Sequence, residues 1–228
     1  MSPRTLALFD LDYTLLEGDT EELWARFLHR QGLVDGNFVL TIEAFYRQYD
    51  QGALDFPVYE EFLLGPLAGL PMHFLSALRD DFLKELRQML RPGMLDRLER
   101  HRRDNCKALL VTAANSFLAE PVARLLGFSD LICTQIETSN GKLTGRIGRM
   151  PAFRQGKVVL LAEWLRENKI SLKDSWGYSD SHNDLPLLEL VDHPVMVTPD
   201  PFLRAYGLER GWELLEPAFD GPPGQRTR

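Results

Sequence analysis

Two aspartates, Asp10 and Asp12, follow the first apolar segment of the chain, which the residues Leu6 to Phe9 predict to be a short buried strand. Alternate residues of an extended segment point the same way, so the two carboxylates converge on one small volume. They repel each other unless a proton or a cation lies between them, and hard oxygen ligands suit Mg²⁺. The pair therefore fits covalent and acid–base catalysis, although a turn capped by an aspartate also explains it.

A second acidic pair, Asp180 and Asp184, lies in a tight loop after a strand expected from Ser175 to Ser179. A calcium loop of the EF-hand type is excluded because position 185 is Leu where that motif needs Gly. A helix cap explains Asp184, since Pro186 suits the first turn of a helix. It leaves Asp180, at the end of a buried strand, unexplained.

Two more polar residues stand where an anion would bind. Thr112 ends a strand expected from Ala108, and its hydroxyl with the free backbone N–H groups of the next residues, such as Ala113, makes an anion cradle. A plain helix cap by Asn115 or Ser116 is the alternative. Lys157 begins another expected helix, where a cation opposes the helix dipole but balances anionic oxygens. Taken alone, Lys157 is also explained as an ordinary surface lysine.

The elements that position these residues alternate between strand and helix after Gly93, which predicts an α/β fold with a doubly wound parallel sheet. Before Gly93 the chain is mostly helical. Asp19 or Thr20 can cap the first of four helices, and Arg91-Pro92-Gly93 closes the block. We therefore expect an α/β core of residues 1–15 and 92–228, split by a helical cap of residues 16–91. A disordered tail is expected from Asp220 to Arg228.

In their order along the chain, Asp10-Leu-Asp12-Tyr-Thr14, Thr112, Lys157 and Asp180-Ser-His-Asn-Asp184 resemble the four short motifs of the haloacid dehalogenase-like phosphohydrolases. The resemblance is to the branch that includes phosphoserine phosphatase, and it covers the α/β part of the chain. It implies a Rossmann-like core and a phosphomonoesterase that forms an aspartyl-phosphate.

The resemblance also implies a role for each residue. Asp10 is expected to be the nucleophile, and Asp12 the acid and base that serves the leaving oxygen and then the water. Mg²⁺ is expected on Asp10, the carbonyl of Asp12 and Asp180, with Asp184 supporting its water shell. The residues expected to hold phosphoryl oxygens are Thr112, Ala113, Lys157 and Asn183.

Several residues depart from the family pattern. Tyr13 stands where a small residue is usual, and Ser181-His182 replaces a glycine-rich form. The insert shows no arginine-rich segment like the one that holds the substrate carboxylate in phosphoserine phosphatases. Asp19 falls where that family has an acidic residue facing the substrate amine. The substrate hypothesis is therefore an amine-bearing metabolite such as histidinol phosphate or phosphoserine.

Charge and composition exclude other classes of function. The 228-residue chain has a net charge of −7, and Leu16 to Leu90 carries thirteen acidic against six basic residues. This acidity argues against nucleic-acid binding. The solvated surface of the helices explains the excess, although a preference for a cationic ligand also does. Two cysteines, Cys106 and Cys133, provide no disulfide framework.

Neither a signal peptide nor an apolar span of about 20 residues is evident, which predicts a cytoplasmic protein that does not bind membranes. We expect a monomer or homodimer that acts on a small phosphorylated metabolite. A phosphotransferase with the same intermediate, or a non-catalytic relative that binds a phosphorylated ligand, remains an alternative.

Overall fold

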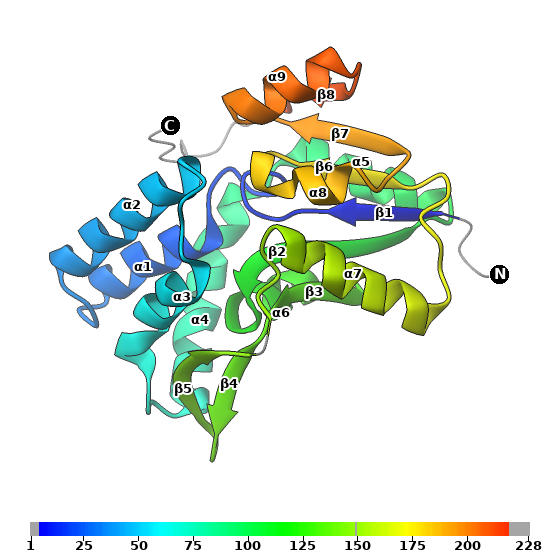
Figure 1. The fold of residues 1–228 in the computed structure, drawn as a ribbon. Coiled ribbons are helices and arrows are strands. Elements are labelled where there is room, and N and C mark those ends of the chain that lie inside the picture. Colours follow the sequence, from blue (N-terminus) through cyan, green and yellow to red (C-terminus); the bar gives the residue numbers. More distant parts are fainter. Residues whose placement is uncertain (1–4, 149, 219–228) are drawn as a thin grey trace.

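A six-stranded sheet runs through the centre of the molecule (Figure 1), and the computed structural model describes residues 5–148 and 150–218. All neighbouring strands of this sheet are parallel, in the order β3-β2-β1-β6-β7-β8. The expected tail from Asp220 lies outside the described residues. The strands are β1 (Leu6–Phe9), β2 (Lys107–Asn115), β3 (Asp130–Thr134), β6 (Trp176–Ser179), β7 (His193–Val197) and β8 (Glu213–Leu215).

The strand order places the carboxyl ends of β1 and β6 side by side. The chain adds β2 and β3 on one side of β1 and then returns to add β6, β7 and β8 on the other. Ligands of doubly wound folds bind at this reversal of strand order, outside the carboxyl ends of the strands. Asp10 and Asp180 each follow one of these two strands directly. The predicted doubly wound α/β fold is confirmed.

Helices cover both faces of the sheet, and β1 shows why. Ala7 and Phe9 point to a core shared with α5 (Pro92–Arg103) and α6 (Ser116–Leu125). Leu6 and Leu8 point to the opposite core, shared with α7 (Gln155–Asn168) and α8 (Leu185–Leu188). All four side chains are buried, as expected of a parallel strand covered on both sides.

Four helices fill residues 16–91, which we call the helical insert. Its two connections to the sheet lie together, because Leu16 and Leu90 form an antiparallel bridge and the N–H of Arg91 donates to the carbonyl of Leu15 at 2.9 Å. The aromatic rings of Trp24, Phe27 and Phe82 pack together inside the insert. The helices are α1 (Thr20–Arg30), α2 (Gly36–Asp50), α3 (Phe56–Leu64) and α4 (Met72–Leu86).

A small hairpin touches the insert from the sheet side. Strands β4 (Ile136–Ser139) and β5 (Lys142–Ile147) join at Asn140-Gly141, where both residues have the positive φ that a tight hairpin turn requires. The predicted hairpin is thereby confirmed. The N–H of Gly69 in the insert donates to the carbonyl of Leu143 at 2.8 Å. The insert thus contacts this hairpin as well as being joined to the sheet through its linkers.

Three elements differ from the sequence-based expectation. Arg91-Pro92-Gly93 does not end the helical block, because Pro92 is the first residue of α5, a position where its missing N–H costs no hydrogen bond. Strand β2 does not end at Thr112 but continues to Asn115 after a shift in its register with β3. Helix α9 (Pro201–Glu209) and strand β8 follow the last strand that the sequence indicated.

Candidate active site

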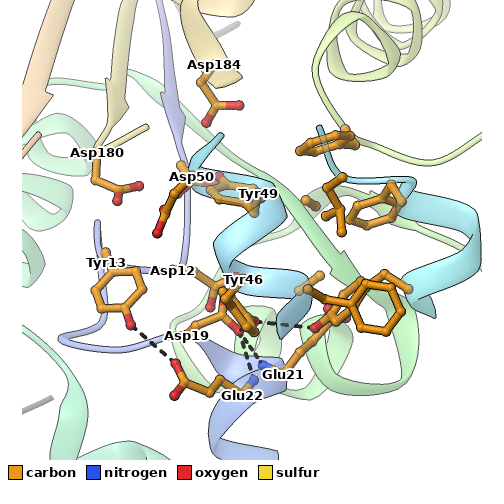
Figure 2. Close-up of a pocket in the computed structure, with 18 of the residues that line it drawn as sticks. Asp12, Tyr13, Asp19, Glu21, Glu22, Tyr46, Tyr49, Asp50, Asp180 and Asp184 are labelled. Carbon is orange, nitrogen blue, oxygen red and sulfur yellow. Dashed lines mark hydrogen bonds between the residues drawn. The ribbon is translucent and has the colours of Figure 1, made fainter. Parts of the chain in front are cut away.

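A cavity of about 270 Å³ opens at the carboxyl ends of β1 and β6 and reaches into the helical insert. Figure 2 shows Asp180 and Asp184 at one end of it and Asp19, Glu21 and Glu22 at the other. Asp10, Asp12 and Lys157 also line the wall. The four residues that the sequence singled out for catalysis or metal binding, Asp10, Asp12, Asp180 and Asp184, therefore share one space with Lys157, which was expected to hold phosphate.

Lys157 joins two of these carboxylates. Its Nζ donates to Oδ1 of Asp10 and to Oδ2 of Asp184, both at 2.8 Å. Burial alone would lower the pKa of Lys157, but the two carboxylates outweigh it and raise that pKa, so the ammonium stays charged. Burial raises the pKa of Asp10 to about 7 against the pull of Lys157, and the charges of Asp184 and Asp180 add to the rise. One lysine does not balance the carboxylates around it.

Asp12 is held by the start of α1. The backbone N–H of Thr20 donates to Oδ1 of Asp12 at 2.7 Å, and the Thr20 hydroxyl donates to the same oxygen. Burial raises the pKa of Asp12 well above its usual range, and the negative charges of Asp19 and Asp10 raise it further. A carboxyl group that keeps its proton at neutral pH is suited to act as a general acid.

The donor set fits a hydrated magnesium ion. Within residues 5–148 and 150–218, no three His, Cys, Asp or Glu side chains form a ready-made metal cluster. Mg²⁺ does not need one, since it is usually bound through one or two carboxylates and keeps several waters. Asp10 and Asp180 line the same cavity, and next to burial the negative charges of Asp184 and Asp180 contribute to the raised pKa of Asp10. A divalent cation would supply the missing positive charge.

The residues expected to hold phosphate are placed differently from one another. Lys157 and Ala113 line the cavity. Thr112 is fully buried within β2, and its hydroxyl accepts a hydrogen bond from the N–H of Ala114 at 3.1 Å. Asn183 is not part of the cavity wall, and its Oδ1 accepts from Nε of Arg154 at 2.7 Å. In this structure only Lys157 and Ala113 of the four reach the cavity.

Asp19 caps a helix of the insert and also lines the cavity. Its Oδ1 caps α1 by accepting from the N–H groups of Glu21 and Glu22, at 2.9 and 3.0 Å, and it also accepts from the hydroxyl of Tyr46. Asp19 still lines the cavity. Tyr13, the unusual residue after Asp12, has a φ of 52° and also lines it, with its hydroxyl 3.5 Å from Oε2 of Glu22.

Most of the insert's contribution was missed from the sequence. Six residues of α2 line the cavity, and four of them, Glu43, Tyr46, Arg47 and Asp50, follow spacings of three or four along one face of the helix. That polar and aromatic stripe was a usable signal, but nothing in the sequence said which element it would face. The aromatic wall residues are Tyr13, Phe45, Tyr46, Tyr49, Phe56, Tyr59 and Phe153.

A buried acid pair joins the insert to the core beside the cavity. Oε1 of Glu21 accepts from the N–H and from Nδ2 of Asn115, at 2.8 and 2.7 Å. The same Nδ2 lies 3.3 Å from Oε2 of Glu60 in α3. Burial raises the pKa of both glutamates. The side chain of Asn115 thus contacts both acids, and burial favours the protonated form of each.

Residues 7–189 of the chain match the family model of the haloacid dehalogenase-like hydrolases. The chain belongs to this family. The predicted family, fold class and enzyme class, a phosphoric monoester hydrolase, are confirmed. In the part of the haloacid dehalogenase-like chain that the structure describes, no helix is long and apolar enough to cross a membrane.

Similar proteins carry related names. A histidinol-phosphatase of Neisseria meningitidis is 36% identical over 218 residues, which cover 93% of this chain and 98% of that protein. A Bordetella pertussis protein of unknown function is 39% identical, with a TM-score of 0.86 over 94% of this chain and 99% of that one. A substrate-bound phosphoserine phosphatase has the same fold, with a TM-score of 0.72 at 17% identity, covering 99% of this chain and 97% of that one.

Proposed function

We propose that this chain is a Mg²⁺-dependent phosphomonoesterase that hydrolyses a small, amine-bearing phosphorylated metabolite through a phosphate ester of Asp10. The observation that carries the proposal is the contact of Lys157 with both Asp10 and Asp184 in a cavity that is also lined by Asp12 and Asp180. This arrangement puts a nucleophile, an acid and a cation in one enclosed space, which is what phosphoryl transfer needs.

The reaction proceeds in two steps, transfer of the phosphoryl group to Asp10 and its hydrolysis. In the first, a carboxylate oxygen of Asp10 attacks phosphorus, and the bond from phosphorus to the leaving oxygen breaks while Asp12 gives that oxygen its proton. In the second, Asp12 takes a proton from water, the water oxygen attacks phosphorus, and the bond to Asp10 breaks. Inorganic phosphate leaves, and both aspartates return to their starting states.

Other groups bind rather than react. Lys157 holds phosphoryl oxygens with its ammonium, and the N–H of Ala113 donates to them from the end of β2. Asp10, the carbonyl of Asp12 and Asp180 would hold Mg²⁺, with Asp184 orienting its waters. When bound, the ion supplies positive charge next to the phosphoryl oxygens. Residues 16–91 act as a cap that excludes bulk water.

The far end of the cavity favours a cationic leaving group. The cavity wall includes the acidic side chains of Asp19, Glu21, Glu22 and Glu43, of which Glu22 and Glu43 both form ion pairs with Arg26. The wall also has seven aromatic rings, and among its described residues only Arg47 and Lys157 are basic. Carboxylates and aromatic faces both attract an ammonium or imidazolium group. A leaving group that also carries a carboxylate, as that of phosphoserine does, is bound less favourably because its negative charge is repelled by these carboxylates. Histidinol phosphate, the substrate class named for the Neisseria relative, fits this chemistry.

Phosphate release from a panel of phosphomonoesters, with Mg²⁺ or with EDTA, tests the proposal. The panel contains histidinol phosphate, phosphoserine, sugar phosphates and p-nitrophenyl phosphate. We expect turnover with Mg²⁺, its loss in Asp10→Asn, and no change in Asp35→Asn, an exposed helix-capping acid away from the cavity. Sugar phosphates that outrun all amine-bearing esters would refute the substrate class. A folded protein that turns over nothing would favour a binding relative, and transfer to added glycerol would identify a phosphotransferase.

A further inference from the structure

The loop of residues 180–184, which we call the β6 loop, is tied to the next strand–helix junction by His182. The backbone N–H of His182 donates to Oδ2 of Asp200 at 2.6 Å, and its ring Nδ1 lies 2.9 Å from the same oxygen. His182 is not part of the cavity wall. The residue that departs from the glycine-rich family pattern therefore faces Asp200 rather than the substrate.

Asp200 makes two further bonds from its place just before α9. Its Oδ1 accepts from the N–H of Leu203 at 2.8 Å and so caps the helix. Its own N–H donates to the carbonyl of Asp180 at 2.8 Å. Asp200 is 7% exposed and lies off the cavity wall. One buried residue thus holds the β6 loop at Asp180 and at His182 while α9 holds that residue in place.

We propose that Asp200 is a positioning residue that fixes the β6 loop, through His182, so that the carboxylate of Asp180 stays in the metal site. The proposal rests on the proposed function, in which Asp180 binds Mg²⁺.

The reason is electrostatic. Asp180 shares the cavity with Asp10 and Asp184, and its charge is among those that raise the pKa of Asp10. Like charges in one cavity push each other apart, so an untethered loop would carry Asp180 outward before the cation arrives. Groups that orient metal ligands in this way usually contribute about 10- to 100-fold to metal affinity.

The test separates the loop tie from the helix cap. In Asp200→Ser the serine still caps α9, because serine is a favoured N-cap residue, but its single short oxygen no longer holds His182. Asp35→Ser is the matched control, since Asp35 caps α2 by accepting from the N–H of Phe38 at 2.9 Å and is exposed. Calorimetric titration of each full-length protein with Mg²⁺ gives the dissociation constant directly, and kcat and KM are measured beside it.

We expect Asp200→Ser to raise the Mg²⁺ dissociation constant by about 10- to 100-fold and to lower kcat more than it raises KM. Excess Mg²⁺ should restore much of that kcat. Asp35→Ser should bind Mg²⁺ like the wild type, within about twofold. Equal Mg²⁺ affinity in Asp200→Ser and the wild type would overturn the proposal.

A second pair of variants covers the case in which Asp200→Ser does not fold. His182→Ala removes the ring bond and leaves the cap of α9 intact, so we expect Mg²⁺ to bind about tenfold more weakly, the effect of one charge-assisted hydrogen bond. His182→Asn places an amide N–H near the position of Nδ1 and should recover most of the affinity. Unchanged affinity in His182→Ala would overturn the proposal.

Failure of the proposed function would look different. If the wild type itself bound no Mg²⁺, the metal role of Asp180 would be wrong, and amide hydrogen exchange in residues 180–184 of the metal-free protein would decide the positioning role. Faster exchange in Asp200→Ser than in Asp35→Ser supports it, and equal exchange overturns it.

Discussion

The hydroxyl of Tyr49, near the end of α2, donates a 2.8 Å hydrogen bond to Oγ of Ser181 in the β6 loop. This bond links the helical insert to the loop that carries Asp180 and Asp184. Aromatic contacts support it, because Phe153 packs against Tyr49 and stacks on Phe56 with the ring centroids 4.8 Å apart. The second departure from the family pattern in this loop, Ser181, is thus a contact with the insert.

Tyr49→Phe should weaken the link between the helical insert and the β6 loop while keeping the aromatic ring in the cavity wall. The ring stays, but Ser181 loses its donor, and a net hydrogen bond is worth about 1 kcal/mol. We expect kcat/KM to fall about fivefold and the free energy of unfolding to fall by about 1 kcal/mol. Tyr206→Phe is the control, since Tyr206 bonds to exposed Glu189 away from the cavity. Unchanged kcat/KM in Tyr49→Phe would show that the bond does not contribute to closure.

Asp12→Asn should reduce activity to a different extent for substrates with different leaving groups. The amide keeps an oxygen for the N–H of Thr20 but has no proton to give at neutral pH. Alkyl phosphates need that proton, so their kcat/KM should fall about 10²- to 10⁴-fold. p-Nitrophenyl phosphate has a leaving group that departs unprotonated, so the variant should release about one equivalent of nitrophenolate per enzyme in a burst and then stall, because the second step also needs Asp12.

Rapid-mixing absorbance records that burst, and acid-quenched protein should contain the phosphorylated aspartate. Asp35→Asn should behave like the wild type with both substrate types. Equal losses for alkyl and nitrophenyl phosphates, with no burst, would show that Asp12 is not the acid.

Glu60→Gln should stabilise the protein at alkaline pH. Glu60 is fully buried, and its Oε1 has no hydrogen-bond partner among the described residues. Burial raises its pKa to about 8, while hydrogen bonds from Glu21 and Asn115 oppose the rise. The folded protein therefore keeps a proton that the unfolded chain releases near its ordinary pKa of 4.5, so stability falls as pH rises between these values.

The neutral amide of Gln does not titrate, so it removes this loss of stability at high pH, and it can still form hydrogen bonds with its neighbours. We expect the variant to be about 2 kcal/mol more stable than the wild type at pH 8, with the difference shrinking toward pH 5. Urea unfolding at several pH values measures it. Glu61→Gln, at the exposed neighbouring position of α3, should show no such trend. A pH-independent difference for Glu60→Gln would mean that Glu60 is ionised in the folded protein.

The sequence predicted that Asp10, Asp180 and Lys157 come together because strand periodicity and parallel order place them at one edge of the sheet. Asp10 and Asp180 follow buried strands, and Lys157 lies in the first turn of a helix that packs on the sheet, so topology alone brings them to one edge. Thr112 was expected at a strand end, but β2 continues past it. Local patterns do not reveal a register shift, since it depends on pairing with β3.

The part of the cavity wall that comes from the helical insert and from the loop before α7 could not be predicted in the same way. Tyr49, Asp50 and Phe153 face the cavity only because α2 and α3 dock over the loop before α7, and such contacts join residues about a hundred positions apart. Asn183 matched its motif position, yet Arg154 binds its side chain. Periodicity shows that a helix has a polar face, but packing between elements decides what that face meets.

His101 should make the protein sensitive to acid. It is 8% exposed in α5, its Nε2 lies 2.7 Å from the hydroxyl of Tyr178, and the rings of Phe9 and Trp176 pack on it. Burial lowers its pKa to about 4, and Arg97 adds to the effect while Asp104 opposes it. Between pH 6.5 and 4 the unfolded chain therefore binds a proton at this position that the folded protein does not, so stability falls as the pH falls.

A shift of this size removes about 3 kcal/mol of stability from the wild type between pH 7 and pH 4. His101→Gln keeps a polar end for Tyr178 and cannot titrate, so it should start less stable at pH 7 but lose about 3 kcal/mol less on acidification. Replacing exposed His73 by Gln should leave the acid loss of the wild type unchanged. Urea unfolding at half-unit pH steps gives the three curves. Parallel curves for His101→Gln and the wild type would mean that the pKa of His101 is the same in the folded and the unfolded protein, which would contradict the prediction.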